Sequence, residues 1–165
     1  MEAVRKIVTG VNDKGQSIFS KDDGIPDMFG GSGMEGFTDQ GQLAMADLWL
    51  GTLPSSNAAS NFGERSGEYD LNPDPSTMLV RIAEFPPEPE GIAKPGAGLD
   101  SHPGFHQTDT TDIIIVLEGE IYSMMETEEK LLKAGDVLIQ RGTNHAWSNR
   151  SGKPVKMAAI MLSTQ

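Results

Sequence analysis

The sequence HQTDTTDIIIVLEGEI, residues 106–121, places one histidine and two aspartates directly before a run of strand-forming residues. Imidazole and carboxylate groups bind divalent metals and transfer protons in general acid–base catalysis. Asp109 and Thr110 are equally suited to hydrogen-bonding backbone groups where a strand begins. His106, Asp109 and Asp112 therefore indicate either the rim of a metal site or the cap of a buried strand.

The composition excludes several kinds of chemistry and of partner. A chain of 165 residues is long enough for one domain with a substantial core. Its formal net charge of -11, without a cluster of Lys or Arg, makes nucleic acid and anionic membranes poor partners. The chain has no cysteine, which excludes disulfides, thiolate ligands and a cysteine nucleophile. The first ten residues predict no signal peptide and no span is long enough for a transmembrane helix, so we expect a cytoplasmic protein.

The first half of the chain alternates strand signals with long stretches that have no pattern. Residues 4–20 predict two short strands joined by a turn at Asp13-Lys14-Gly15. Residues 43–51, LAMADLWLG, are apolar enough for a strand, and a short helix is the alternative. Residues 21–42 and 53–76 lack periodicity, which predicts either surface loops or a lid over an active site.

The second half predicts a succession of short strands. Residues 77–85 form a strand that Pro86-Pro87 ends, and a loop follows over 88–100. The later turns are expected at Glu118-Gly119-Glu120, at Ala134-Gly135-Asp136, and in a closing hairpin around Ser151-Gly152-Lys153-Pro154. Turn signals that recur about every 8 to 12 residues predict an all-β barrel or sandwich.

Two segments of this half resemble the two sequence motifs of the cupin family. In AGDVLIQRGTNHAWSN, the second motif falls on Gly135-Asp136, Gly142, His145 and Asn149, with Gln140 in the usual proline position. The resemblance covers residues 77–163. It implies a double-stranded β-helix, the jelly-roll barrel of single-domain small cupins, with its core at 77–165. Residues 1–76 would then be an N-terminal strand extension with long loops in the same domain.

The first cupin motif matches TDIIIVLEGEI less completely. Gly119 matches its turn, and counting back places Asp112 on the motif's glutamate. The motif's second histidine is replaced by Thr108, and its first is His106. Two of the four ligand positions of the family therefore carry other residues.

The resemblance implies a metal site built from both motifs. Side chains alternate along an extended chain, so His106 and Thr108 share one face. A barrel that joins the two segments brings the His106 and His145 imidazoles together, and Asp112, or Asp109 if the strand begins elsewhere, supplies a carboxylate. Two histidines and one carboxylate suit Fe, Zn, Mn or Ni, and threonine leaves the fourth position to water or substrate. The alternative is that His145 is a structural histidine.

Other side chains of the same segments would form the substrate pocket. Trp147 has the parity of His145, and Tyr122 and Met124 share a face of a neighbouring strand. These residues either fill the barrel or form the flat wall of a pocket. Arg141 is a candidate anchor for a substrate carboxylate. The expected substrate contacts are Trp147, Tyr122, Met124, Arg141, Gln140 and Thr108, and we place His102 at the rim.

Three functions are compatible with these features. The first is a metal-dependent enzyme acting on a small carbonyl- or carboxylate-bearing molecule, aromatic or unsaturated, by decarboxylation, dehydration, isomerisation or dioxygenation. The second is a metal-free lyase in which His145 and Asp112 act as base and acid. The third is a binding module without chemistry. The cupin resemblance also implies a homodimer, with the hairpin at 4–20 as the segment available for pairing.

Overall fold

The computed structural model describes residues 4–25, 28–29, 43–52, 72–89, 92 and 102–163. Every regular element in this range is a β-strand, which confirms the predicted all-β class, and none of it is a helix able to cross a membrane. The loops expected at 21–42, 53–76 and 88–100 lie largely outside the described residues. The loop prediction is wrong at 21–25 and 28–29, which are described and form strands. The strands are β1 (Val4–Val11), β2 (Ser17–Ile25), β3 (Met28–Phe29), β4 (Ala44–Thr52), β5 (Thr77–Phe85), β6 (Thr110–Glu118), β7 (Glu120–Met125), β8 (Glu129–Lys133), β9 (Val137–Arg141), β10 (His145–Ser148) and β11 (Val155–Ser163).

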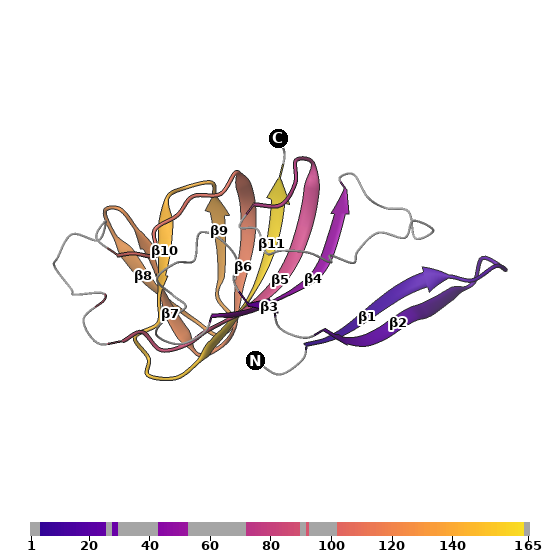
Figure 1. Cartoon of the computed structure of the whole chain (residues 1–165), viewed down its shortest axis with the longest axis horizontal. Helices are drawn as coiled ribbons and strands as arrows, with labels where there is room; N and C mark the ends of the chain where they lie inside the picture. The colour runs from indigo at the N-terminus through magenta and orange to yellow at the C-terminus, as the bar shows by residue number, and fades with distance from the viewer. Residues whose placement is uncertain are drawn as a thin grey trace.

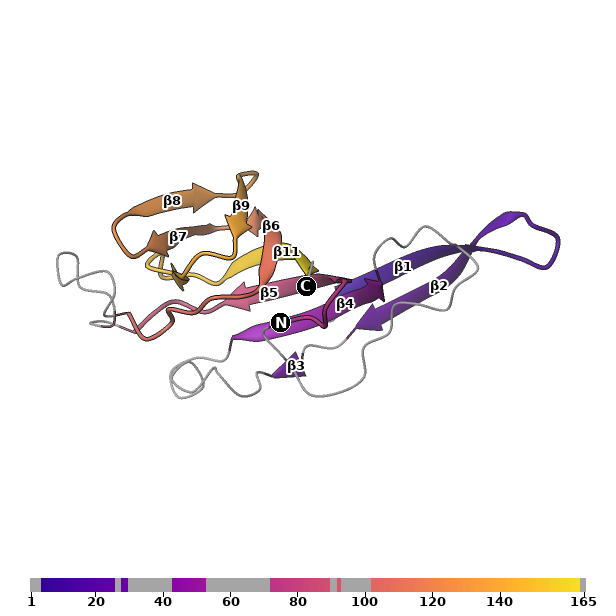
Figure 2. The same ribbon diagram turned by 90° about the horizontal axis from the view of Figure 1, so that it is seen from above.

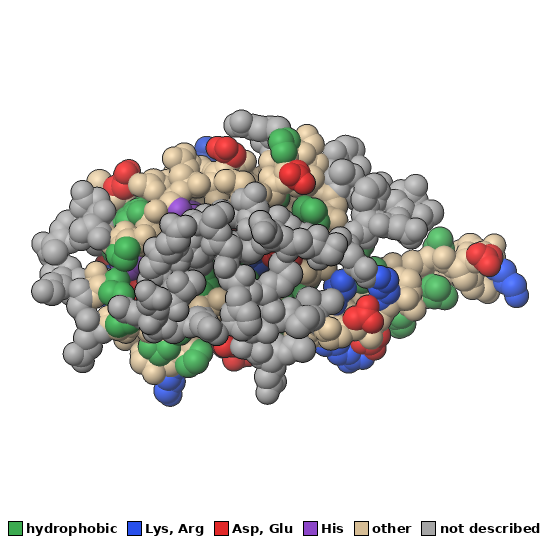
Figure 3. Space-filling view, viewed as in Figure 1, with side chains coloured by type: hydrophobic (Ala, Val, Ile, Leu, Met, Phe, Trp, Pro, Cys, Tyr) green, Lys and Arg blue, Asp and Glu red, His purple; other side chains and the backbone are tan. Residues whose placement is uncertain are grey.

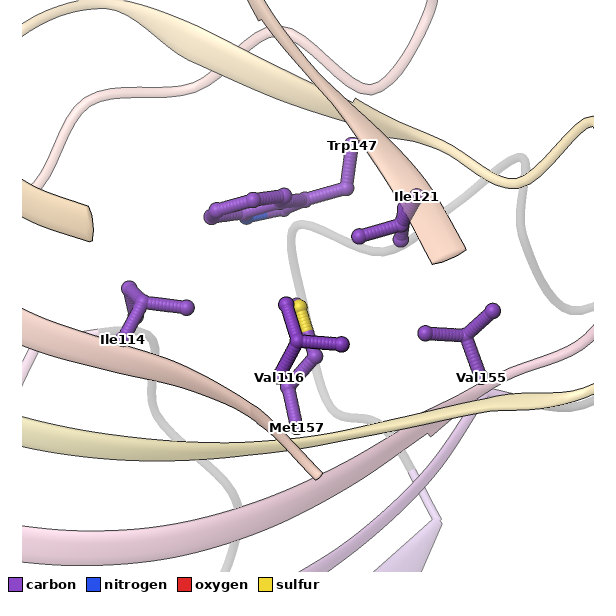
Figure 4. Close-up of a cluster of buried hydrophobic side chains, with 6 residues drawn as sticks. All are labelled: Ile114, Val116, Ile121, Trp147, Val155 and Met157. Atoms are coloured by element: carbon purple, nitrogen blue, oxygen red, sulfur yellow. The ribbon is translucent and has the colours of Figure 1, made fainter. Parts of the chain in front are cut away.

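Two sheets enclose the core of the barrel (Figures 1 and 2). The larger has the strand order β3-β4-β5-β11-β6-β9, and the smaller has the order β10-β7-β8. Figure 4 shows their inner faces in contact, with Trp147 and Ile121 from the smaller sheet above side chains of the larger one. The larger sheet contributes Ile114, Val116, Val155 and Met157 to this cluster. The structure thus has the jelly-roll form.

Alternation along β6 decides which of its side chains reach the interior. Asp112, Ile114 and Val116 are buried, while Thr111 is exposed and the intervening isoleucines are half-buried. This period of two is what a strand with one covered face requires. The same alternation that builds the core therefore directs one carboxylate, that of Asp112, to the inside.

The turns lie where the sequence predicts them, but they do not all join paired strands. At Gly119 the chain leaves the larger sheet for the smaller with a φ of 82°, and a Cβ there would lie 3.0 Å from the Val155 side chain. The hairpin predicted around residues 151–154 is wrong. The turn exists, with Gly152 at a φ of 71°, but β10 pairs with β7 whereas β11 lies between β5 and β6. Turn chemistry is local, whereas the core determines which strands pair.

The hairpin predicted at the N-terminus is confirmed as β1 paired with β2, and it extends away from the two sheets (Figures 1 and 2). Hydrophobic as well as charged side chains lie along it (Figure 3). Phe19 is 77% exposed, and Ile7, Val11 and Ile18 are exposed too. An isolated two-stranded hairpin is at best marginally stable in water. These features favour a second copy of the chain as the cover of the hairpin.

We therefore expect a homodimer in solution. Light scattering at micromolar concentration should give twice the chain mass of 17.7 kDa. Replacing Phe19 with Ser should shift the population toward the monomer, because it removes the most exposed aromatic side chain of the hairpin. Lys14→Ser, at the tip of the same hairpin, is the control and should leave the mass unchanged. A parent protein that scatters as a monomer throughout this range would contradict the expectation.

Candidate functional site

The two motif histidines meet across a backbone bridge. His106 lies in the segment before β6 and His145 begins β10, and each backbone N–H donates to the other residue's carbonyl at 2.9 Å. Their ring centroids lie 4.3 Å apart with the rings tilted by 52°. Residues directly opposite each other in a bridge project their side chains to the same side. The predicted juxtaposition of the two imidazoles is therefore present.

Backbone carbonyls fix the orientation of both rings. His106 Nδ1 lies 2.8 Å from the Gly104 carbonyl oxygen, and His145 Nδ1 lies 2.8 Å from that of Thr143. A carbonyl oxygen can only accept, so each Nδ1 carries a proton and donates it. A neutral ring then has its lone pair on Nε2. This is the hydrogen-bond pattern by which proteins orient histidines that bind metals.

Burial keeps the His145 ring neutral. Desolvation, and to a smaller extent the nearby His106, lower the pKa of His145 to about 4 against the opposing effect of the bond to the Thr143 carbonyl. At neutral pH, His145 is thus an imidazole with an available lone pair. It can act as a metal ligand or as a general base.

Asp112 is the carboxylate that the fold brings to this pocket. It is 4% exposed, and its Oδ1 has no hydrogen-bond partner in the described structure. Burial raises the pKa of Asp112, opposed by a hydrogen bond with Thr110 and by the electrostatic effects of His106 and Arg81. A buried carboxylate oxygen without a partner is costly, so it marks a place for a proton, a cation or a bound group. Asp109, by contrast, is exposed on the surface.

The three donor groups do not already form a metal cluster. Within the described ranges, no group of three His, Asp or Glu side chains is arranged to hold an ion. The histidine pair supplies two donors, and Asp112 lines the same pocket without completing the set. The donor types fit Fe, Zn, Mn or Ni. An ion held by the two histidines would take its remaining ligands from Asp112, water or the bound molecule.

A cavity of about 100 Å3 opens beside the histidines. Its polar side chains come from Arg81, His106, Thr108, Asp112 and His145. Trp147 stands edge-on to His145, with ring centroids 5.7 Å apart, as its parity predicts. The apolar lining consists of Leu43, Met45, Ala83, Phe85, Ile114, Trp147, Met157, Ala159 and Met161, and the loop residues are Pro103, Gly104 and Phe105. The site is a largely apolar pocket with its polar groups gathered together.

Arg81 is the pocket residue that sequence reasoning missed. It comes from β5, is buried, and is bonded through Nε and Nη2 to the carboxylate of Asp47 on β4, at 2.6 and 3.1 Å. The two residues are register partners. A signal was available, because each is a charged residue in the middle of a largely apolar strand, and such charges are seldom buried unless they are paired.

Four of the expected substrate contacts lie away from the pocket. Tyr122 and Met124 share a face of β7, as predicted, but that face is covered by Arg150, whose guanidinium lies 4.3 Å from the Tyr122 ring centroid. The inward position on β7 is Ile121. Gln140 is buried but its amide donates to the Thr143 carbonyl at 3.2 Å, and Arg141 is exposed on β9.

The remaining expected residues lie at or behind the pocket. Thr108 lines it, and its hydroxyl is hydrogen-bonded to that of Thr110 at 2.8 Å. Trp147 both lines the pocket and packs in the core cluster, so the two roles weighed for it coexist. His102, expected at the rim, is buried behind His106 and pairs with Glu88.

The second half of the chain is similar to a known protein family. Residues 92–161 match the family model described as Cupin domain. A solved structure from Salmonella typhimurium LT2, assigned as ethanolamine utilization protein Q, aligns over 100% of both chains with a TM-score of 0.50 and 14% identity. At that identity, the likeness shows the fold alone.

The curated relatives are fungal proteins. Phomopsin biosynthesis cluster protein C' of Diaporthe leptostromiformis is 42% identical over 82 residues, which are 44% of this chain and 43% of the relative. The cupin-domain-containing oxidoreductase srdD of Neurospora crassa is 26% identical over 158 residues, covering 93% of this chain and 70% of the relative. The chain spans less than half the length of the first curated relatives that it matches.

Proposed function

Because the chain carries a cupin domain at residues 92–161, we propose that it is an enzyme that converts a small, largely apolar organic molecule bearing a carbonyl or carboxylate group. The observation that carries the proposal is the pair of His106 and His145 rings, both oriented by carbonyls toward one pocket. Relatives named as cupin-domain-containing oxidoreductases favour oxidoreduction as the reaction class. Relatives named as biosynthesis cluster proteins favour a metabolite as the substrate.

The proposed enzyme depends on a divalent metal. His106 and His145 would hold the ion through Nε2, with Asp112 as the carboxylate available to it. A bound Fe, Mn, Ni or Zn ion supplies Lewis acidity at a carbonyl or carboxylate oxygen, and iron also supplies redox chemistry. Asp112 matches this role because its buried Oδ1 lacks any other partner in the described structure.

The rest of the pocket binds and orients the molecule. Its apolar lining excludes water, which strengthens the electrostatic effect of Arg81 and Asp112 on the polar end of the substrate. Trp147 and the other apolar side chains that line the pocket would contact the apolar part of the substrate. A cavity of about 150 Å3 takes up benzene, so about 100 Å3 suits the reacting end of a small molecule rather than a nucleotide.

Metal uptake by the parent protein tests this proposal. Chelator-treated protein should be offered Fe, Mn, Ni and Zn separately, and elemental analysis after gel filtration should find one equivalent of at least one ion per chain. Protein that retains none of the four at stoichiometric level would contradict the metal-dependent function.

Among the described residues no three donors are arranged as a metal cluster, which favours a second candidate, a metal-free lyase or isomerase. In that case neutral His145 is the general base, and Asp112, whose pKa burial raises, is the acid. Turnover of a carbonyl substrate by metal-free protein would support this candidate and exclude the first. Turnover that appears only after an ion is added would do the reverse.

A further inference from the structure

The third histidine of the chain, His102, is close to His106 in sequence but does not line the pocket. His102 is buried, with its side chain 2% exposed, and it heads the short turn that leads to His106. Its Nδ1 lies 3.1 Å from the Gly104 backbone nitrogen, and its carbonyl accepts from Phe105 N–H at 3.2 Å. His102 thus holds this turn at two points.

These contacts determine the tautomer of His102. The Gly104 N–H can only donate, so the Nδ1 of His102 is the unprotonated nitrogen. The ring proton is then on Nε2, which donates to Glu88 Oε1 at 2.7 Å. A doubly protonated ring would place an N–H against the Gly104 N–H. The geometry therefore fits a neutral ring that donates to an ionised carboxylate.

Glu88 connects the turn to the strand that carries the other pocket histidine. Its Oε2 accepts from the Ser148 hydroxyl at 2.8 Å, and its backbone N–H donates to the Asn149 carbonyl at 2.8 Å. Ser148 ends β10, three residues after His145. The Glu88 side chain is only 10% exposed, so this connection is sheltered from water.

The sequence of contacts ends at the pocket. Glu88 fixes His102, His102 fixes the Gly104 amide, and the carbonyl of the same Gly104 accepts from His106 Nδ1 at 2.8 Å. We propose that Glu88 and His102 are positioning residues, which hold the Gly104 carbonyl so that the Nε2 lone pair of His106 is presented to the pocket. The role in ion binding rests on the proposed function, whereas the role in orienting the ring does not.

Two amide substitutions at one position test the proposal. In His102→Asn, the shorter side chain can still accept from the N–H two residues on, as asparagine does in Asx turns. In His102→Gln, the extra methylene moves the acceptor away from Gly104. The tautomer of His106 is read by 15N NMR of the metal-free, histidine-labelled protein, and Zn2+ affinity is measured by competition with a chromophoric chelator.

We expect His102→Asn to keep the Nδ1–H tautomer of His106 and the parent's Zn2+ affinity. His102→Gln should populate the Nε2–H tautomer and weaken Zn2+ binding by about 10- to 100-fold, the effect of losing a partner that orients a ligand. If both amides leave His106 and the affinity unchanged, or if both change them equally, the proposal is overturned. A parent that binds none of Fe, Mn, Ni and Zn would contradict the proposed function, yet the tautomer difference would still decide the positioning role.

A further variant covers the case in which His102→Gln does not fold. Glu88→Leu removes the acceptor of His102 without altering the turn itself, and it should shift the His106 tautomer in the same direction but less. A folded Glu88→Leu protein whose His106 spectrum equals the parent's would also overturn the proposal.

Discussion

Replacing either His106 or His145 with alanine is expected to abolish stoichiometric binding of the divalent ion. Each variant removes one of two imidazoles whose Nε2 atoms are presented to the same pocket. The affinity should fall by more than the roughly 10- to 100-fold that is lost when only an outer partner of a ligand is changed. Titration calorimetry of metal-free protein with Zn2+ and Mn2+ measures this loss directly.

Three variants make the result specific. Asp112→Asn should weaken binding, because it removes the charge from the carboxylate that lines the pocket. Asp109→Asn should not, since Asp109 is exposed. His102→Asn removes an imidazole that lies outside the pocket but keeps an acceptor for the Gly104 N–H, and should keep one ion per chain. A His145→Ala protein that binds one equivalent with the parent's affinity would show that the ion, if any, is held elsewhere.

Breaking the buried pair of Arg81 and Asp47 is expected to have the largest effect on stability. The side chains are only 5% and 1% exposed, and the bond between them has two points of contact. Asp47→Leu leaves a buried guanidinium without its carboxylate, and should lower the free energy of unfolding by about 3 to 5 kcal/mol. Arg81→Met should do the same to the carboxylate. Urea unfolding followed by tryptophan fluorescence provides the measurement.

The double variant distinguishes a lost ion pair from lost packing. Asp47→Leu with Arg81→Met replaces both charges by apolar groups of similar size, and should recover most of the stability of the parent. Arg141→Met, the same chemical change at an exposed strand position, should alter the free energy of unfolding by less than about 0.5 kcal/mol. A double variant as unstable as the worse single variant would mean that strand packing, not the unpaired charge, is responsible.

The sequence predicted the elements well because the signals for strands and turns are local. Pro86-Pro87 ends β5 where expected, and Gly119 and Gly135 occupy turns with positive φ. Parity along β10 correctly placed Trp147 beside His145. Side chains alternate between the two faces of a strand, so the residues that share a face can be found from the sequence alone. These predictions therefore needed no knowledge of distant segments.

Predictions that depended on the partner of a strand were less successful. The alternation of side chains placed Tyr122 and Met124 on the same face of β7, but it could not say whether that face is the inner or the outer one. Ile121 packs in the core, so the face with Tyr122 and Met124 is the outer one. Arg141 was chosen as the substrate anchor for its place near a motif, whereas the arginine in the pocket is Arg81. Its role depends on Asp47, which lies 34 residues earlier and becomes its neighbour only through sheet register.

The position of β11 has a consequence for how the protein is made. The strand that is synthesised last of the eleven lies in the middle of the larger sheet, hydrogen-bonded to β5 on one side and to β6 on the other. During translation, β5 and β6 therefore emerge before the strand that hydrogen-bonds to both of their facing edges. Until β11 follows, these edges are open to pairing with other chains. The larger sheet of this barrel is therefore completed by β11, the last of its described strands to be synthesised.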